Sequence, residues 1–324
     1  MIYWQSVFIL LILSLSPALL WLYFYYRKDY IQPEPKKLIV KTFLYGMLAA
    51  LPLLVVQYVN RFYPDWSVLN LVQRSISNYL LGSILFYMIV AYVEEYLKHI
   101  GMVALVEKHR SEFDQIVDGI MYAVASALGF VFVENLLYFW AAQAVFGLSA
   151  HLLLIFSVRA IVSTLAHTVF SGYFGYFYAK AKLDHHITSS NKTKLTHFNR
   201  DLLSGAWKLH VFRSHLSVNR PSQSKHEPRL LVAEGFFLAF ILHFIYNMLV
   251  SVNFGTYNFA YLVVPLLFLA AYYLFSQFYC EHNHIIVKRK PGKLLDILCW
   301  PEKRKFIKEY GHSEEEWREL FVRK

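Results

Sequence analysis

Seven long apolar runs dominate this chain and restrict it to folds that cross a lipid bilayer. They cover residues 2–26, 38–58, 82–106, 116–146, 151–179, 235–252 and 257–279. A helix of ~20 apolar residues spans the ~30 Å hydrocarbon core of a bilayer. Only 17% of the residues are charged, whereas a soluble protein has about a quarter. We therefore expect an all-α, polytopic transmembrane helical bundle with about seven spans.

The distribution of basic residues predicts how these runs are oriented. The connections after the first and fifth runs, and the tail, are rich in Lys and Arg, and the short connection after the third run, residues 107–115, carries two. The much longer connection after the second run also carries only two, and those after the fourth and sixth runs carry none. Cytoplasmic connections of membrane proteins carry this excess. We therefore expect an outside N-terminus, a cytoplasmic C-terminus, and a basic cytoplasmic insert over 180–234 between spans five and six. The predicted domains are a transmembrane domain over 1–279, which contains the insert, and a cytoplasmic tail over 280–324.

The formal net charge of +10 is concentrated in those connections and the tail. The sequence shows no basic, folded soluble module of the kind that would bind nucleic acid, so we expect the lipid bilayer as a partner and no nucleic acid. Cys280 and Cys299 are the two cysteines, and both follow the last apolar run. Two cysteines on a cytoplasmic side do not predict a disulfide framework.

The third apolar run carries two adjacent carboxylates and a lysine near its middle: Glu94, Glu95 and Lys98. A single charge at the bilayer centre costs ~2.5–3.5 kcal/mol even on lenient scales. Ionisable residues inside the membrane therefore indicate a functional site that faces the protein interior. Glu94 and Lys98 are four residues apart and share a helix face, so the lysine can partly neutralise the glutamate.

Three further runs carry ionisable residues near their midpoints, namely Glu134, His167 and His243. Four separate helices would thus bring polar groups to one depth, which predicts a shared site. Asn247 follows His243 by one helical turn and adds an amide to the same face. A single intramembrane histidine can also be a simple hydrogen-bond partner between helices, and we interpret Arg159 as the partner of a carboxylate rather than a catalytic group.

These segments resemble the PrsW family of intramembrane proteases. The segment Glu94–Lys98 is similar to its E-E-x-x-K motif, and residues 118–122 with 129–135 resemble its second block. His167 with the following Ser-Gly pattern resembles the third block, and residues 243–247 the fourth. Four ordered blocks form a specific signal. The family often has Asp where this chain has Asn247, so no carboxylate role is carried over to that position.

The resemblance covers about residues 20–279 and implies a metal-dependent protease of the cell membrane, related to the CAAX prenyl proteases, with the paired glutamates essential. It also implies a single-pass membrane protein as substrate. The best-known role in the family is a first, site-1-type cut in an anti-sigma factor during stress signalling. The insert and the tail fall outside the family pattern, so the substrate can differ.

Peptide hydrolysis needs an activated water, a stabiliser for the oxyanion and a proton donor for the leaving nitrogen. We expect Glu94 or Glu95 to be the base, Lys98 to tune the glutamates, and Asn247 to orient the substrate carbonyl or the oxyanion. The candidate ligands of a divalent metal, with zinc as the leading choice, are Glu134, His167 and His243. A metal-free mechanism, in which a glutamate and His167 activate the water, stays open.

Two functions of other classes use similar residues. A proton- or ion-coupled transporter also places carboxylates and histidines at mid-membrane, but the sequence shows no inverted repeat. A non-catalytic scaffold could hold transmembrane helices with the same polar groups. Cleavage of a single-pass substrate by the purified protein distinguishes a protease from both.

Overall fold

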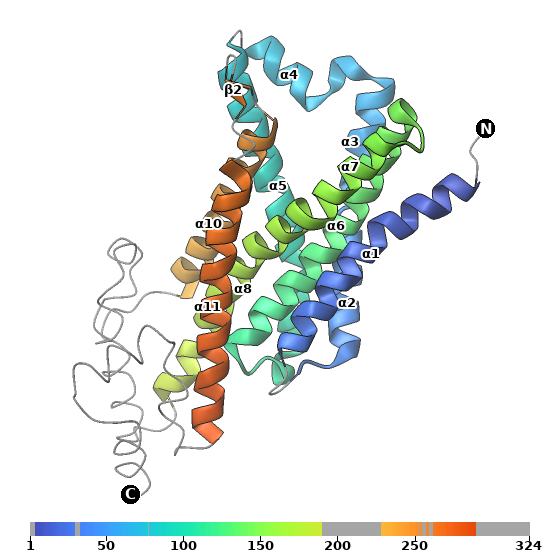
Figure 1. Cartoon of the computed structure of the whole chain (residues 1–324). Helices are drawn as coiled ribbons and strands as arrows, with labels where there is room; N and C mark the ends of the chain where they lie inside the picture. The colour runs from blue at the N-terminus through green and yellow to red at the C-terminus, as the bar shows by residue number, and fades with distance from the viewer. Residues whose placement is uncertain are drawn as a thin grey trace, which may run out of the picture. The chain divides into compact units, whose positions relative to one another are not determined.

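The computed structural model describes residues 4–29, 33–76, 78–189, 228–251, 253–254, 257–258 and 262–289. Helices make up nearly all of this part of the chain (Figure 1). They are α1 (Trp4–Lys28), α2 (Lys36–Ala49), α3 (Leu51–Phe62), α4 (Val68–Ser75), α5 (Tyr79–Lys108), α6 (Ile116–Phe146), α7 (Ala150–Val158), α8 (Thr164–Ser189), α10 (Pro228–Ser251) and α11 (Val263–Arg289). The two-residue strands β1 (Asn253–Phe254) and β2 (Tyr257–Asn258) pair antiparallel. The predicted all-α fold is confirmed.

Six helical stretches of the described residues are long and apolar enough to cross a membrane. They are Gln5–Lys28, Lys36–Asn60, Tyr79–Lys108, Ile116–Phe146, Ala150–Leu183 and Pro228–Ser251. The seventh predicted run forms α11, whose apolar part, Val263–Phe278, is shorter than the others. The prediction of a multi-pass membrane protein is therefore confirmed, with six such stretches in the described part where the sequence suggests seven, and the orientation stays a prediction.

The insert and the tail fall mostly on residues 190–227 and 290–324, which lie outside the described residues. At its start the expected insert is helical, because α8 continues to Ser189. The chain divides into two compact units, Met1–Ala179 with Val232–Leu274 and Lys180–Leu231 with Phe275–Lys324. The predicted domain boundaries stay predictions, and the polar site described below lies within the first unit.

Helix α6 forms the centre of the first unit, and α1, α2 and α5 pack against it (Figure 1). Nearly every side chain of α6 from Val117 to Asn135 is buried. Glycines allow its neighbours to approach closely: a Cβ on Gly129 would lie 1.9 Å from the Phe43 carbonyl oxygen of α2. Small residues at such crossings let helix backbones touch inside a membrane, and this packing fixes the depth at which α6 presents its polar side chains.

Two irregularities interrupt the spans. The second apolar run breaks at Ala50 between α2 and α3, and Pro52 lies in the first turn of α3, where its missing N–H donor needs no helical partner. A five-residue π-helical turn, η3 (Arg159–Ser163), lies between α7 and α8. Its backbone is held by side chains, since Thr164 Oγ1 donates to the Arg159 carbonyl (2.8 Å) and Trp21 Nε1 donates to the Ala160 carbonyl (3.2 Å). Single π-turns are frequent at functional sites.

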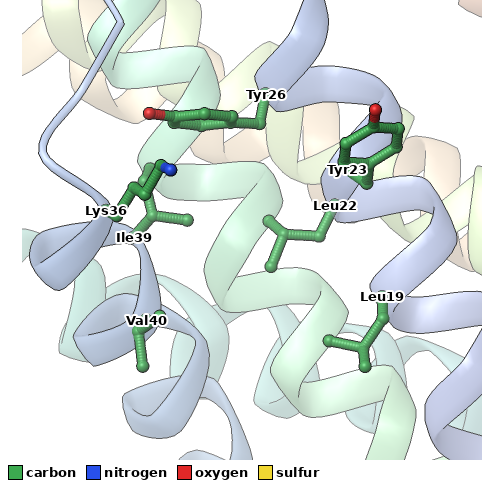
Figure 2. Close-up of a pocket in the computed structure, with 7 residues that line it drawn as sticks. All are labelled: Leu19, Leu22, Tyr23, Tyr26, Lys36, Ile39 and Val40. Carbon is green, nitrogen blue, oxygen red and sulfur yellow. The ribbon is translucent and has the colours of Figure 1, made fainter.

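An open apolar groove of about 230 Å³ lies between α1 and α2 (Figure 2). It is lined by Leu19, Leu22, Tyr23, Tyr26, Lys36, Ile39 and Val40. None of these side chains belongs to the polar site predicted from the sequence, so the groove does not bear on the catalytic chemistry.

Candidate active site

Glu95 on α5 is fully buried and enclosed by partners. Its Oε1 accepts hydrogen bonds from Lys98 Nζ (2.7 Å) and from His243 Nδ1 (2.7 Å). Its Oε2 lies 3.2 Å from His99 Nε2 and accepts a long hydrogen bond from Ser171 Oγ (3.5 Å). A buried carboxylate with partners on both oxygens keeps its neighbours in place.

The bond from His243 to Glu95 fixes the state of the imidazole. An ionised carboxylate can only accept, so a neutral His243 carries its proton on Nδ1 and keeps the lone pair of Nε2. Nε2 lies 3.6 Å from Glu94 Oε2. Carboxylates orient metal-bound histidines in this way in many proteins, because the hydrogen bond selects the tautomer and the ring direction.

Glu94 from α5, His167 from α8 and His243 from α10 each offer one ligand atom, and these atoms lie within 4.8 Å of one another. We call these three residues the ligand group. All three are buried, and Glu94 Oε2 and His167 Nδ1 have no hydrogen-bond partner among the described residues. An unsatisfied buried polar atom costs ~1–3 kcal/mol. One carboxylate and two imidazoles form a donor set of catalytic zinc sites, so these residues fit a divalent metal.

Glu134 on α6 stands next to the ligand group. Its Oε1 accepts from Arg159 Nη2 (2.7 Å), and its Oε2 lies 3.3 Å from His167 Nε2 without a hydrogen bond. The sequence predicts Glu134 as a ligand together with the two histidines. In the structure Glu94 groups with both histidines, and Glu134 lies beside His167. The expected pairing of Arg159 with a carboxylate is present.

Lys98 and Asn247 occupy different surroundings. Lys98 is completely buried, and its Nζ lies 2.7 Å from Glu95 Oε1 but 3.9 Å from Glu94 Oε2. The lysine therefore neutralises mainly Glu95, although the spacing of four residues favours Glu94. Its Nζ also lies 4.8 Å from the ring centroid of Phe130. Asn247 is half-buried on the turn of α10 that follows His243, and it is not a member of the ligand group.

Sequence reasoning did not single out Tyr138, although its ring is part of the site. The Arg159 guanidinium carbon lies 3.7 Å from the Tyr138 ring centroid. The available signal was its position on α6, since Tyr138 follows Glu134 by four residues and shares its face. Asn135, part of the predicted second block, accepts from Arg159 Nε at 2.7 Å.

The sequence is similar to proteins of one known family. A family model described as PrsW family intramembrane metalloprotease matches residues 34–212, more than half of the chain. Relatives named Protease PrsW include those of Geobacillus kaustophilus, 28% identical over 54% of this chain and 68% of the relative, and Oceanobacillus iheyensis, 30% identical over 56% and 73%. The Bacillus subtilis relative is 25% identical over 54% and 70%. No solved structure matches. The family match includes Glu94, Glu134 and His167 and ends before α10 with His243.

Proposed function

Because the chain belongs to the PrsW family of intramembrane metalloproteases, and so is a protease, we propose that it hydrolyses single-pass membrane proteins at the ligand group. The observation that carries this proposal is the convergence of Glu94, His167 and His243 from three helices to within 4.8 Å, inside an apolar bundle. Their donor atoms suit zinc, and the burial of the group keeps the reacting peptide bond away from bulk water.

Each polar residue of the site has a distinct task in this proposal. Glu94, His167 and His243 would hold the zinc ion, which when bound acidifies a water molecule and polarises the scissile carbonyl. Glu134 Oε2, buried and without a hydrogen bond, accepts the proton of the water and returns it to the leaving nitrogen. Glu95 holds His243 in the required tautomer.

Two further residues complete the proposed site. Lys98, at 2.7 Å from Glu95, balances the charge of that carboxylate. Asn247 lies one turn beyond His243 and is proposed to donate its amide hydrogen to the developing oxyanion. An alternative mechanism of peptide hydrolysis uses no metal. In it, Glu94 takes the proton of the water directly and His167 assists. The observation that favours this mechanism is that Glu94 Oε2 has no hydrogen-bond partner among the described residues.

Metal content measured together with cleavage separates these versions. Purified protein is expected to contain about one zinc ion and to cut a single-pass reporter. Glu94→Gln and His167→Ala lose both metal and cleavage, whereas Glu134→Gln keeps the metal and retains only slow, measurable cleavage. Asp65→Asn, at an exposed position on η1 (Pro64–Trp66), serves as the matched control.

Two results would revise the proposal. Full cleavage by protein stripped of metal would establish the metal-free mechanism. Loss of zinc in Glu134→Gln would make Glu134 a ligand, as the sequence suggests.

For the substrate we propose an anti-sigma factor with one transmembrane segment, on the basis of the family role. Co-expression of the protease with single-pass anti-sigma factors from the same genome tests this. A shortened anti-sigma factor should accumulate with the wild-type enzyme and be missing with Glu94→Gln. Equal processing by both enzymes would assign that cut to another protease.

A further inference from the structure

Arg159 lies beside the ligand group but has no part in the reaction as described so far. Its side chain is only 14% exposed, within a stretch long and apolar enough to cross the membrane. It donates from Nη2 to Glu134 Oε1 and from Nε to Asn135 Oδ1, both at 2.7 Å. Its guanidinium also stacks on Tyr138. A cation with three partners on one helix is fixed in position, unlike an arginine that only extends toward the membrane surface.

The π-turn η3 explains how Arg159 reaches this place. Arg159 and His167 are eight residues apart, which in a regular α-helix sets their directions about 80° apart at ~100° per residue. A π-turn accommodates one extra residue and removes about 100° of that rotation, so both side chains face α6. This agrees with the contacts, since Arg159 and His167 meet the two different oxygens of the same Glu134 carboxylate.

The π-turn leaves backbone carbonyls without their regular helical hydrogen bonds. Its freed backbone carbonyls need side-chain donors, which Thr164 and Trp21 supply. Thr164 Oγ1 in turn accepts from Asn135 Nδ2 at 3.4 Å. A hydrogen-bonded chain therefore runs from α6 through the π-turn and back to the guanidinium, and it defines one position for Arg159.

We propose that Arg159 is a positioning residue for peptide hydrolysis, which holds Glu134 Oε1 so that Oε2 faces the reacting water beside His167. This inference rests on the proposed function, in which Glu134 moves the proton. The planar guanidinium fork binds Glu134 and Asn135 together, a geometry that the point charge of a lysine cannot reproduce.

A double-mutant cycle tests whether Arg159 acts through Glu134. The variants are Arg159→Ala, Arg159→Lys, Glu134→Gln and the double variant Arg159→Ala/Glu134→Gln. For each, kcat and KM on the single-pass reporter are measured together with zinc content and the thermal unfolding midpoint. Arg74→Ala removes an exposed arginine that pairs with Asp65 and is the control expected to match the wild type.

Arg159→Ala should lower kcat by about 10²-fold, as expected for a misplaced catalytic group, with KM and zinc content unchanged. Arg159→Lys should recover part of that loss. In the Glu134→Gln background, Arg159→Ala should cause no additional loss, because both changes disable one proton transfer. If Arg159→Ala does not fold, Arg159→Lys replaces it in the cycle. Arg159→Lys should then lower kcat in the wild-type background and cause no further loss of kcat in the Glu134→Gln background.

Three results would overturn the inference: a normal kcat in Arg159→Ala, loss of zinc in a folded Arg159 variant, or the full loss repeated in the Glu134→Gln background. The last would mean that Arg159 acts on the substrate independently. A fully active Glu134→Gln would instead refute the proposed role of Glu134, so failure of the function and failure of this inference give different patterns.

Discussion

At the scale of single residues, Glu94 and Glu95 are adjacent in sequence but have different surroundings. Successive residues of a helix point ~100° apart, so Glu94 groups with His167 and His243 as a possible ligand, whereas Glu95 binds Lys98 and the other nitrogen of His243. Glu95 accepts hydrogen bonds on both oxygens, the one on Oε2 being long (3.5 Å), whereas Glu94 Oε2 has no hydrogen bond among the described residues. We therefore expect substitutions at the two positions to fail in different ways.

Glu95→Gln is expected to weaken zinc binding by about 10–100-fold, because His243 loses the carboxylate that sets its tautomer. Excess zinc should restore much of the cleavage by Glu95→Gln and none by Glu94→Gln. The measurement is reporter cleavage against zinc concentration, normalised to the folded fraction because Lys98 loses its charged partner. A Glu95→Gln enzyme that stays inactive at every zinc concentration would place Glu95 in the reaction itself.

The polar residues that the structure brings together could be singled out from the sequence, because ionisable groups stand out in apolar runs. Glu94, His167 and His243 could be placed at one depth by their position along each run. Which atoms meet could not be predicted, since this depends on the rotation of each helix about its axis. Lys98 illustrates the limit: spacing favours its pairing with Glu94, whereas the packed helices place it on Glu95.

At the scale of elements, the crossing of α2 and α6 depends on glycine. A Cβ on Gly129 would lie 1.9 Å from the Phe43 carbonyl, and one on Gly46 would lie 1.9 Å from the Ser126 carbonyl. Backbone atoms cannot move aside as a flexible side chain can. The Ser126 hydroxyl also donates to the Lys98 carbonyl at 2.6 Å, so a displaced α2 would disturb α6 where it contacts α5.

Gly129→Ala is therefore expected to lower the thermal unfolding midpoint markedly, through overpacking that costs about 1–3 kcal/mol or more. Gly82→Ala in α5 is the matched control, because its new Cβ would have no neighbour closer than 3.8 Å. Alanine is also the better helix former, so the control should be neutral or slightly stabilising. Equal thermal unfolding midpoints for Gly129→Ala and Gly82→Ala would show that α2 and α6 can move apart without loss of stability.

Elements with a chemical signature are easier to recognise in a sequence than those that arise from packing. Pro52, in the first turn of α3, is such a signature for the break between α2 and α3. The π-turn over Arg159–Ser163 has no comparable signature, since the residue that it absorbs is recognisable only when the two flanking helical segments are packed. It changes which residues share a face with His167, so the role of Arg159 could not be inferred from spacing.

At the scale of the whole molecule, stability should depend on pH through the connection between α1 and α2. Asp29 and Glu34 are buried there, and the Tyr122 hydroxyl donates to Glu34. Burial, followed by the charge of Glu34, raises the pKa of Asp29 to about 7. Burial likewise raises the pKa of Glu34.

An acid with a raised pKa in the folded state stabilises the protein fully below its unfolded pKa of ~3.9, and this contribution is lost as the pH rises through the folded value. The unfolding midpoint should therefore fall as the pH rises from about 4 to about 7 and level off above that. Asp29→Asn should make this fall smaller. Asp65→Asn, at an exposed position, should keep the wild-type slope. If the unfolding midpoint depends on pH in the same way in the wild type and in Asp29→Asn, Asp29 is not the group responsible.

The number of crossings also determines where the C-terminal tail lies. With the N-terminus outside, six crossings leave the chain outside after α10, and only a seventh brings the tail into the cytoplasm. The apolar part of α11, Val263–Phe278, is ~24 Å long at 1.5 Å per residue, below the ~30 Å core. A short span can be accommodated by local thinning of the bilayer at modest cost, and the many Lys and Arg residues of the tail favour the cytoplasm.

We therefore expect α11 to cross, and labelling of single cysteines tests this. In protein with Cys280 and Cys299 changed to Ser, an impermeant maleimide added outside intact cells should label Asp65→Cys on η1. It should label Ser111→Cys, in the short helix η2 (Arg110–Glu112), and Ser313→Cys, in the tail, only after the cells are permeabilised. Labelling of Ser313→Cys but not Ser111→Cys from outside would mean that α11 does not cross. Labelling of Ser111→Cys but not Asp65→Cys would reverse the whole orientation, because these positions lie at opposite ends of the α5 span.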